Sequence, residues 1–155
     1  MRILILNGPN LNLLGRREPE IYGRESLPDI ELLCEQRAAE LGIEVACIQS
    51  NSEGALIDAL HAHRDWDGIV INAAAYTHTS LALADAIAAI GLPTVEVHLS
   101  NVFAREQIRH TSLISPVVWG QVTGFGYRGY LAAIDLLHGR LSDGTSDPGH
   151  TEASA

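Results

Sequence analysis

Short apolar runs alternate along the chain with longer segments in which apolar residues recur every three or four positions. The runs with strand character are 3–6, 43–49, 68–72, 94–100 and 116–122. The segments with helical spacing are 26–41, 52–64, 80–90, 104–110 and 127–138. This alternation is typical of right-handed βαβ units, which build a parallel sheet covered by helices on both faces. We therefore predict a three-layer α/β fold. A flavodoxin-like five-stranded sheet of order 2-1-3-4-5 is the preferred topology, although periodicity alone does not determine the order.

Local signals mark where the first long helix begins and where the domain ends. Ser26 followed by Asp29 resembles a capping box, and Gly42 provides a stop. From Gly139 onwards the chain consists largely of Ser, Gly, Asp, Thr and Ala, which bury little apolar surface. We predict a single domain over residues 1–140 and a disordered tail over residues 141–155.

Length, charge and hydropathy limit the partners and the location. With 155 residues and a net charge of −9, the chain is expected to be one acidic domain. Nucleic acids and anionic membranes need basic patches, so neither is an expected partner. No apolar run reaches the roughly 18 residues that a membrane span needs, and the N-terminus enters a strand without a signal-peptide pattern. The expected location is therefore the cytoplasm.

The residue types also exclude two kinds of chemistry. The chain contains no lysine, because all 10 of its strong bases are arginines. Imine catalysis and a P-loop both require lysine, so both are excluded. Cys34 and Cys47 fall in a helical and a strand-type segment and are expected to be buried thiols; a disulfide or a metal pair is the less favoured alternative. No Cys/His set has zinc-ligand spacing, so no metal site is expected.

Polar residues gather where four of the predicted strands end. They are Asn7, Asn10 and Asn12 after the first strand, Asn72 and residues 73–80 after the third, Glu96, His98, Ser100 and Asn101 on or after the fourth, and residues 120–129 after the fifth. The carboxyl ends of parallel strands meet at one edge of the sheet, which is where open α/β folds bind ligands. The sequence therefore predicts a pocket at this edge.

The fourth strand carries the most specific pattern. Its sequence, TVEVHLSN, places Glu96, His98 and Ser100 on one face by the period-2 rule. A carboxylate and an imidazole are costly inside a buried strand unless they are paired. A lone histidine here would be interpreted as a core residue with satisfied hydrogen bonds. The acid before it and the hydroxyl after it favour proton transfer instead.

The loop after the first strand combines two arginines with a tyrosine. A guanidinium near Tyr22 would favour its phenolate form, and Arg16 and Arg17 are placed to supply that charge. Two solvated arginines and a surface tyrosine explain the same residues equally well. Arg105 and Arg109 lie four apart on a predicted helix, so they share a face that fits either an anion clamp or a solvated surface.

Five separated motifs carry a resemblance to one known family. They are LNGPNLNLLGRREPEIYG, INAAAYTHTS, VEVHLSN, REQIRH and GFGYRGY, and they lie in this order within residues 3–137. They resemble the type II 3-dehydroquinate dehydratases. The resemblance implies a flavodoxin-like fold, a dodecamer built from trimers, and the anti elimination of water from 3-dehydroquinate to give 3-dehydroshikimate, with no metal or organic cofactor. The reaction would serve either the biosynthesis of aromatic compounds or the breakdown of quinate.

The resemblance implies a role for each residue that would do chemistry. Tyr22 would remove the C2 proton, and Arg17 would favour its phenolate form. Asn10 would help to hold a water that stabilises the enolate intermediate. His98 would protonate the departing C1 hydroxyl, and Glu96 would orient His98.

The resemblance also implies the substrate contacts. Asn72 would help to orient His98, while Ser100 and the backbone of Leu99 would hold the substrate carboxylate. Arg109 and His78 would bind ring hydroxyls. The remaining residues are Asp85, which would reach the site of a neighbouring subunit, and the lid residues Arg16, Arg17, Tyr22 and Arg105.

One departure from the family pattern and one alternative function remain. The family usually has Pro-Gly or Gly-Gly after the strand-three asparagine, where this chain has Ala73 and Ala74. If that turn needs a positive φ, alanine costs about 1 kcal/mol there.

The alternative from another functional class is a flavodoxin-like flavin-binding or signalling module. Pro9 argues against a flavin phosphate loop, because proline has no N–H to donate.

Overall fold

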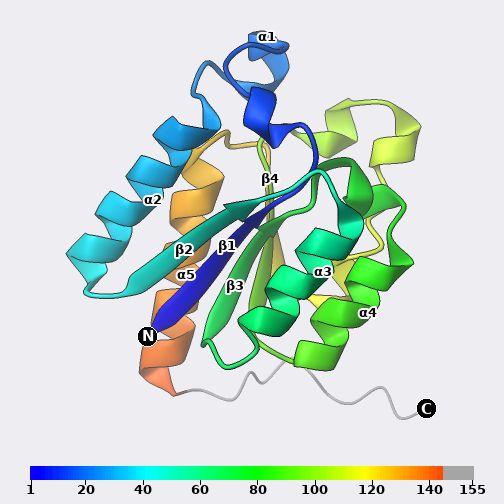
Figure 1. The fold of residues 1–155 in the computed structure, drawn as a ribbon. Helices are drawn as coiled ribbons and strands as arrows, with labels where there is room; N and C mark the ends of the chain where they lie inside the picture. The colour runs from blue at the N-terminus through cyan, green and yellow to red at the C-terminus, as the bar shows by residue number, and fades with distance from the viewer. Residues whose placement is uncertain (145–155) are drawn as a thin grey trace.

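A computed structural model describes residues 1–144 as one parallel sheet with helices packed on both faces (Figure 1). The strands are β1 (Arg2–Asn7), β2 (Glu44–Gln49), β3 (Gly68–Asn72), β4 (Thr94–His98) and β5 (Gly120–Thr123). The α-helices are α1 (Pro19–Tyr22), α2 (Leu27–Leu41), α3 (Glu53–Ala62), α4 (Leu81–Ile90) and α5 (Arg128–Asp143). The strand order is β2-β1-β3-β4-β5, and every pairing is parallel. The predicted flavodoxin-like topology is confirmed.

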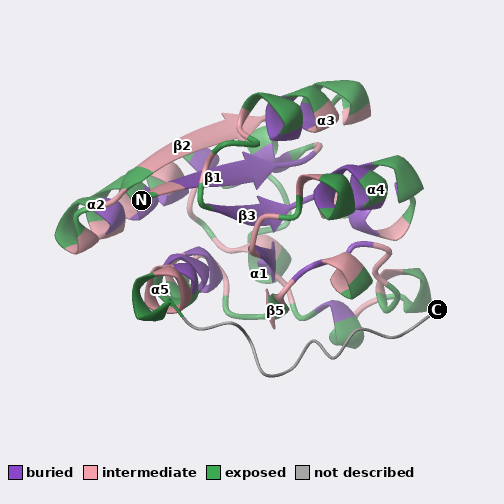
Figure 2. Ribbon diagram, turned by 90° about the horizontal axis from the view of Figure 1, so that it is seen from below, coloured by how far each residue is buried: buried purple, intermediate pink, exposed green. Residues whose placement is uncertain are grey.

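Two apolar layers hold the helices to the sheet. Successive side chains of a strand point to opposite faces, so Ile3 and Ile5 of β1 pack with α2 and α5, whereas Leu4 and Leu6 pack with α3 and α4. Figure 2 shows β3 buried throughout, β1 buried from its second residue on, and the outer helix faces exposed. The central strands therefore need apolar residues at most positions, which explains the continuous apolar runs in the sequence.

The predicted capping box at the start of α2 is present. The Asp29 N–H donates to Ser26 Oγ over 3.3 Å, and the Ser26 N–H donates to Asp29 Oδ2 over 2.9 Å. Gly42 ends the helix with a φ of +70°, a conformation that glycine adopts without cost. Both boundary signals of this helix are confirmed.

The segments that bury few apolar side chains were predicted less well. The expected helix over 104–110 is wrong: the chain there forms the 3-10 turns η3 (Val102–Ala104) and η4 (Gln107–Arg109), separated by extended backbone at Arg105 and Glu106. Seven residues without an apolar stripe have too little packing to offset the cost of helix nucleation. The other 3-10 turns are η1 (Leu11–Leu13), η2 (Ala74–His78) and η5 (Ser115–Val117).

Two boundaries near the C-terminus also differ from the prediction. The last strand begins at Gly120 instead of Pro116, because Pro116 lies within η5. Helix α5 continues to Asp143, past the expected end at His138. Leu137 is fully buried, and the Arg140 guanidinium carbon lies 4.5 Å from the centre of the Trp119 ring, so the last turns have partners. The rest of the predicted disordered tail lies outside the described residues.

Among residues 1–144, no helix is long and apolar enough to cross a membrane.

Candidate active site

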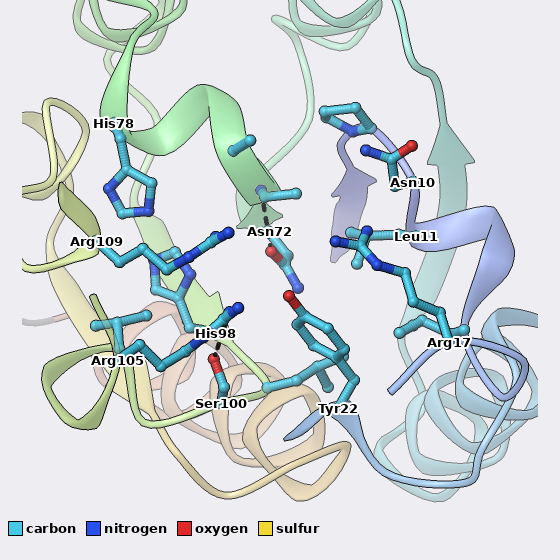
Figure 3. Close-up of a pocket in the computed structure, with 16 residues that line it drawn as sticks. Asn10, Leu11, Arg17, Tyr22, Asn72, His78, His98, Ser100, Arg105 and Arg109 are labelled. Atoms are coloured by element: carbon cyan, nitrogen blue, oxygen red, sulfur yellow. Dashed lines mark hydrogen bonds between the residues drawn. The ribbon is translucent and has the colours of Figure 1, made fainter. Parts of the chain in front are cut away.

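A pocket opens at the carboxyl edge of the sheet, where it was predicted (Figure 3). It is bounded by the loop after β1, the end of β3, the turn η2 and the segment that follows β4. The predicted site residues that line it are Asn10, Arg17, Tyr22, Asn72, His78, His98, Leu99, Ser100, Arg105 and Arg109. Glu96 is fully buried behind this wall, whereas Arg16 and Asp85 are exposed and do not line the pocket.

Glu96 and His98 form a buried pair on β4. Glu96 Oε1 lies 2.7 Å from His98 Nε2, and 0% of Glu96 and 6% of His98 are exposed. Their spacing of two residues places both on one face of the strand, as predicted. If Nε2 carries a proton and donates it to Glu96, then Nδ1 is the ring nitrogen left to exchange a proton with a ligand.

The carboxylate of Glu96 has a full set of donors. Ser112 Oγ donates to Oε1 over 2.8 Å, while Ser115 Oγ and Gln121 Nε2 donate to Oε2 over 2.6 and 3.1 Å. Burial by itself would raise the pKa of Glu96, but the hydrogen bonds from His98, Ser115 and Gln121 and the charge of His98 together lower it below its ordinary value. Glu96 is therefore a carboxylate at neutral pH, and it places a fixed negative charge beside His98.

Ser112, Ser115 and Gln121 belong to the candidate site through their contacts with Glu96, and they were not predicted from the sequence. Burying an ionised glutamate requires donors, so their existence could have been inferred. Their identity could not, because the three residues lie 16 to 25 positions from Glu96 on a loop, a turn and the edge strand. Ser112 also accepts the N–H groups of Ile114 and Ser115, which fixes the turn that presents it.

Tyr22 lies between two guanidinium groups from different parts of the chain. The Arg17 and Arg105 guanidinium carbons are 5.4 and 5.1 Å from the centre of its ring. Arg17 belongs to the same loop as Tyr22, whereas Arg105 follows η3. Because Arg105 approaches from the opposite side of the pocket, its contact with Tyr22 was not foreseen from the sequence.

The other polar side chains add positive charge and hydrogen-bonding groups. Arg109 Nε donates to Glu106 Oε2 over 2.8 Å, and Arg105 Nη1 lies 3.5 Å from Ser100 Oγ. His78 Nδ1 lies 2.8 Å from the Thr111 carbonyl oxygen, and its ring stacks on that of His98 at 6.5 Å between centres. With the guanidinium groups of Arg17, Arg105 and Arg109 in one pocket, the site is suited to a small anion.

Asn72 is placed differently from the expectation. Its Oδ1 accepts the Ala74 N–H over 3.1 Å and its Nδ2 donates to the Tyr130 hydroxyl over 2.9 Å, so these bonds do not go to His98. Ala74 has a φ of +51°, whereas Ala73 has a φ of −76°. The turn therefore does require a positive φ at Ala74, which costs a non-glycine residue about 1–2 kcal/mol.

Comparison with known proteins agrees with this geometry. Residues 1–138 match the family model described as dehydroquinase class II. The chain belongs to this family. The match spans the sheet, the pocket and most of α5, so it covers every residue of the candidate site.

Individual relatives and a solved structure agree with the family assignment. A protein of Dinoroseobacter shibae named 3-dehydroquinate dehydratase is 57% identical over 143 residues, which is 92% of this chain and 95% of the relative. A protein of Jannaschia with the same name is 56% identical, with 94% and 99% covered. The crystal structure of type II dehydroquinase from Butyrivibrio crossotus has a TM-score of 0.87 and 48% identity, with 88% and 97% covered. The resemblance seen in the motifs is confirmed, and membership in this family disfavours the flavin-binding alternative.

Proposed function

We propose that this pocket removes water from 3-dehydroquinate to give 3-dehydroshikimate. The observation that carries the proposal is the arrangement of two proton-transfer groups in one pocket: Tyr22 flanked by two guanidinium groups, and His98 held by Glu96. One group suits a base and the other an acid. Figure 3 shows Tyr22 and His98 entering the pocket from different elements, which fits removal of a proton and a hydroxyl from separate positions of a ring.

The first step of the proposed mechanism is proton removal by Tyr22. A Tyr22 phenolate, lying beside the positive charges of Arg17 and Arg105, would take the proton from C2 and leave an enolate whose charge lies on the C3 oxygen. Asn10 also lines the pocket, and it would hold a water against the C3 oxygen. A positioned donor stabilises negative charge as it develops.

The second step is the departure of the C1 hydroxyl. The His98 imidazolium, stabilised by Glu96, gives its proton to this hydroxyl, the C–O bond breaks, and the C1–C2 double bond forms as water leaves. Ser100 and the backbone of Leu99 would bind the substrate carboxylate, and His78 and Arg109 would bind ring hydroxyls. Tyr22 and His98 return to their starting forms when Tyr22 loses a proton and His98 gains one.

The loop that carries Tyr22 is proposed to act as a lid, defined here as residues 16–24. Most of its side chains are exposed, and its short helix α1 buries none. Such a segment opens at low cost because few contacts hold it. Arg16 and Arg17 would then draw the lid towards an anionic substrate, bringing Tyr22 onto C2 and Arg105 onto the closed lid.

An absorbance assay with 3-dehydroquinate tests the proposed function, because the product is a conjugated enone. We expect turnover without any added cofactor. EDTA should leave the rate unchanged, and borohydride added with the substrate should not inactivate the enzyme, because the chain contains no lysine to form an imine. Absence of turnover, or inactivation by either treatment, would contradict the proposal.

We further propose a cytoplasmic homododecamer, a tetramer of trimers, in which Asp85 serves a neighbouring subunit. Leu81 and Asp85 lie four residues apart on α4, so they share a face, and Leu81 is 65% exposed. An apolar side chain beside a carboxylate on such a face suits a subunit contact.

The proposed cytoplasmic location is supported by the cysteines. Cys34 and Cys47 are free thiols, as is usual for a reducing compartment, and cell fractionation would test that location.

Sedimentation velocity and an Asp85→Ala variant test this assembly. We expect a dodecamer, and the variant should lose activity while its monomer fold, measured by circular dichroism, is retained. Asp58→Ala on α3 is a matched control, because Asp58 is also an exposed helix carboxylate. A fully active monomer, or equal loss of activity in both variants, would argue against a shared site.

A further inference from the structure

Tyr130 joins the ends of two strands beneath the pocket. It lies on α5, is 0% exposed, and its hydroxyl contacts a side-chain amide on each of two neighbouring strands. The hydroxyl lies 2.6 Å from Asn7 Oδ1 and 2.9 Å from Asn72 Nδ2. Asn7 and Asn72 are paired across β1 and β3, so one phenol bridges the two strand ends that border the site.

The directions of these hydrogen bonds determine how the Asn72 amide is turned. The Tyr130 hydroxyl has a single proton and donates it to Asn7 Oδ1, so it can only accept from Asn72. Asn72 must then present Nδ2 to Tyr130 and Oδ1 to the Ala74 N–H. If the Asn72 amide were flipped, its NH₂ group would face the Ala74 N–H, so two donors would oppose each other. Its oxygen would face the Tyr130 hydroxyl, whose only proton is already donated to Asn7.

The orientation of Asn72 matters to the pocket wall. Asn72, Ala74 and Ala75 line the pocket, and the Asn72–Ala74 hydrogen bond supports the residue whose φ is +51°. A strained residue keeps its conformation only when its surroundings impose it. Losing the correct amide orientation would therefore release the turn η2, which also carries His78.

The hydrogen-bonded set of Tyr130, Asn7 and Asn72 leaves one buried polar atom unpaired. Among the described residues, Asn7 Nδ2 is buried without a hydrogen-bond partner, so the network carries an uncompensated cost. Burial raises the pKa of Tyr130 above its ordinary value, and the phenol therefore stays protonated as the network requires. The set fixes one orientation of the Asn72 amide at the pocket wall, and this orientation links it to the site.

We infer that Tyr130 is a positioning residue for the dehydration, acting through Asn72 to hold the Ala74 turn in the pocket wall. This inference rests on the proposed function. Tyr130 touches neither the pocket nor the substrate in this arrangement, and its entire effect on activity passes through the Asn72 amide.

A double-mutant cycle tests the inference. Tyr130→Phe should lower kcat/KM by about tenfold, the scale set by losing one buried hydrogen bond. In an Asn72→Ala background the same change should alter kcat/KM by less than about twofold, because the partner is already gone. Tyr127→Phe is the matched control: it removes a hydroxyl one turn earlier from a partly exposed residue, and activity should be unchanged.

Asn7→Ala gives an independent check if Tyr130→Phe does not fold. It frees the Tyr130 proton to point at Asn72, so it should produce the same loss and the same dependence on Asn72. An equal loss in both backgrounds, or full activity of the single variants, would overturn the inference.

A crystal structure separates this inference from the proposed function. If the unaltered protein fails to dehydrate 3-dehydroquinate, the proposed function fails, and the structure of Tyr130→Phe then decides the inference. A flipped Asn72 amide or a displaced Ala74 supports it, and an unchanged turn overturns it.

Discussion

Tyr22→Phe should lower kcat by at least about 10²-fold, the usual scale for losing a positioned base. The substitution removes only the hydroxyl, so the ring keeps its place between Arg17 and Arg105. Steady-state absorbance measures the loss, and Tyr127→Phe controls for the removal of a tyrosine hydroxyl elsewhere. Turnover of Tyr22→Phe at the unaltered rate would assign the base to another residue.

The two arginines should share the activation of Tyr22. Arg17→Ala should also lower kcat, but by less than Tyr22→Phe, because Arg105 still places a positive charge beside the ring. The double variant Arg17→Ala/Arg105→Ala should approach the loss seen in Tyr22→Phe. If Arg17→Ala changed only KM, its role would be limited to substrate binding.

His98→Ala should likewise lower kcat by at least about 10²-fold, because the C1 hydroxyl would have to leave without a positioned acid. Glu96→Gln should cause a smaller loss in kcat, since the amide can still contact His98 Nε2 but cannot stabilise its positive charge. His61→Ala is a matched control, because His61 is an exposed histidine on α3 and does not line the pocket. Equal activity of His98→Ala and the control would remove His98 from the mechanism.

The same glutamate should make folding stability depend on pH. The pKa of Glu96 is lowered in the folded state, so its carboxylate contributes stability above its unfolded pKa and this contribution is lost as the pH falls through the folded value. Thermal unfolding of the unaltered protein should therefore lose stability on acidification more steeply than Glu96→Gln. Parallel curves for the two proteins would show that the carboxylate is not stabilised by folding.

Much of the fold could be predicted because burial imposes simple periods on the sequence. The continuous apolar runs of β1 and β3 reflect strands covered on both faces. The pairing of Glu96 with His98 followed from strand geometry, since residues two apart share a face. These features are local, and one stretch of sequence contains all the information they need.

The missed features depend on contacts between distant segments. Arg105 reaches Tyr22 across the pocket, and Ser112 reaches Glu96 from a loop, so neither contact has a sequence period. The prediction for 104–110 was wrong for a related reason. None of residues 104–110 is buried, and the backbone there follows neighbouring elements instead of its own helical propensity.

The two guanidinium groups beside Tyr22 have a kinetic consequence, because they come from different segments. Arg17 travels with Tyr22 on the lid, whereas Arg105 follows η3 outside it. In the proposed mechanism, Tyr22 therefore has both positive neighbours only while the lid is docked, and an undocked lid would leave it with Arg17 alone. The observed turnover number would then be the rate of the chemical step multiplied by the docked fraction. Substitutions in residues 16–24 that change only this fraction would alter kcat without touching a reacting atom.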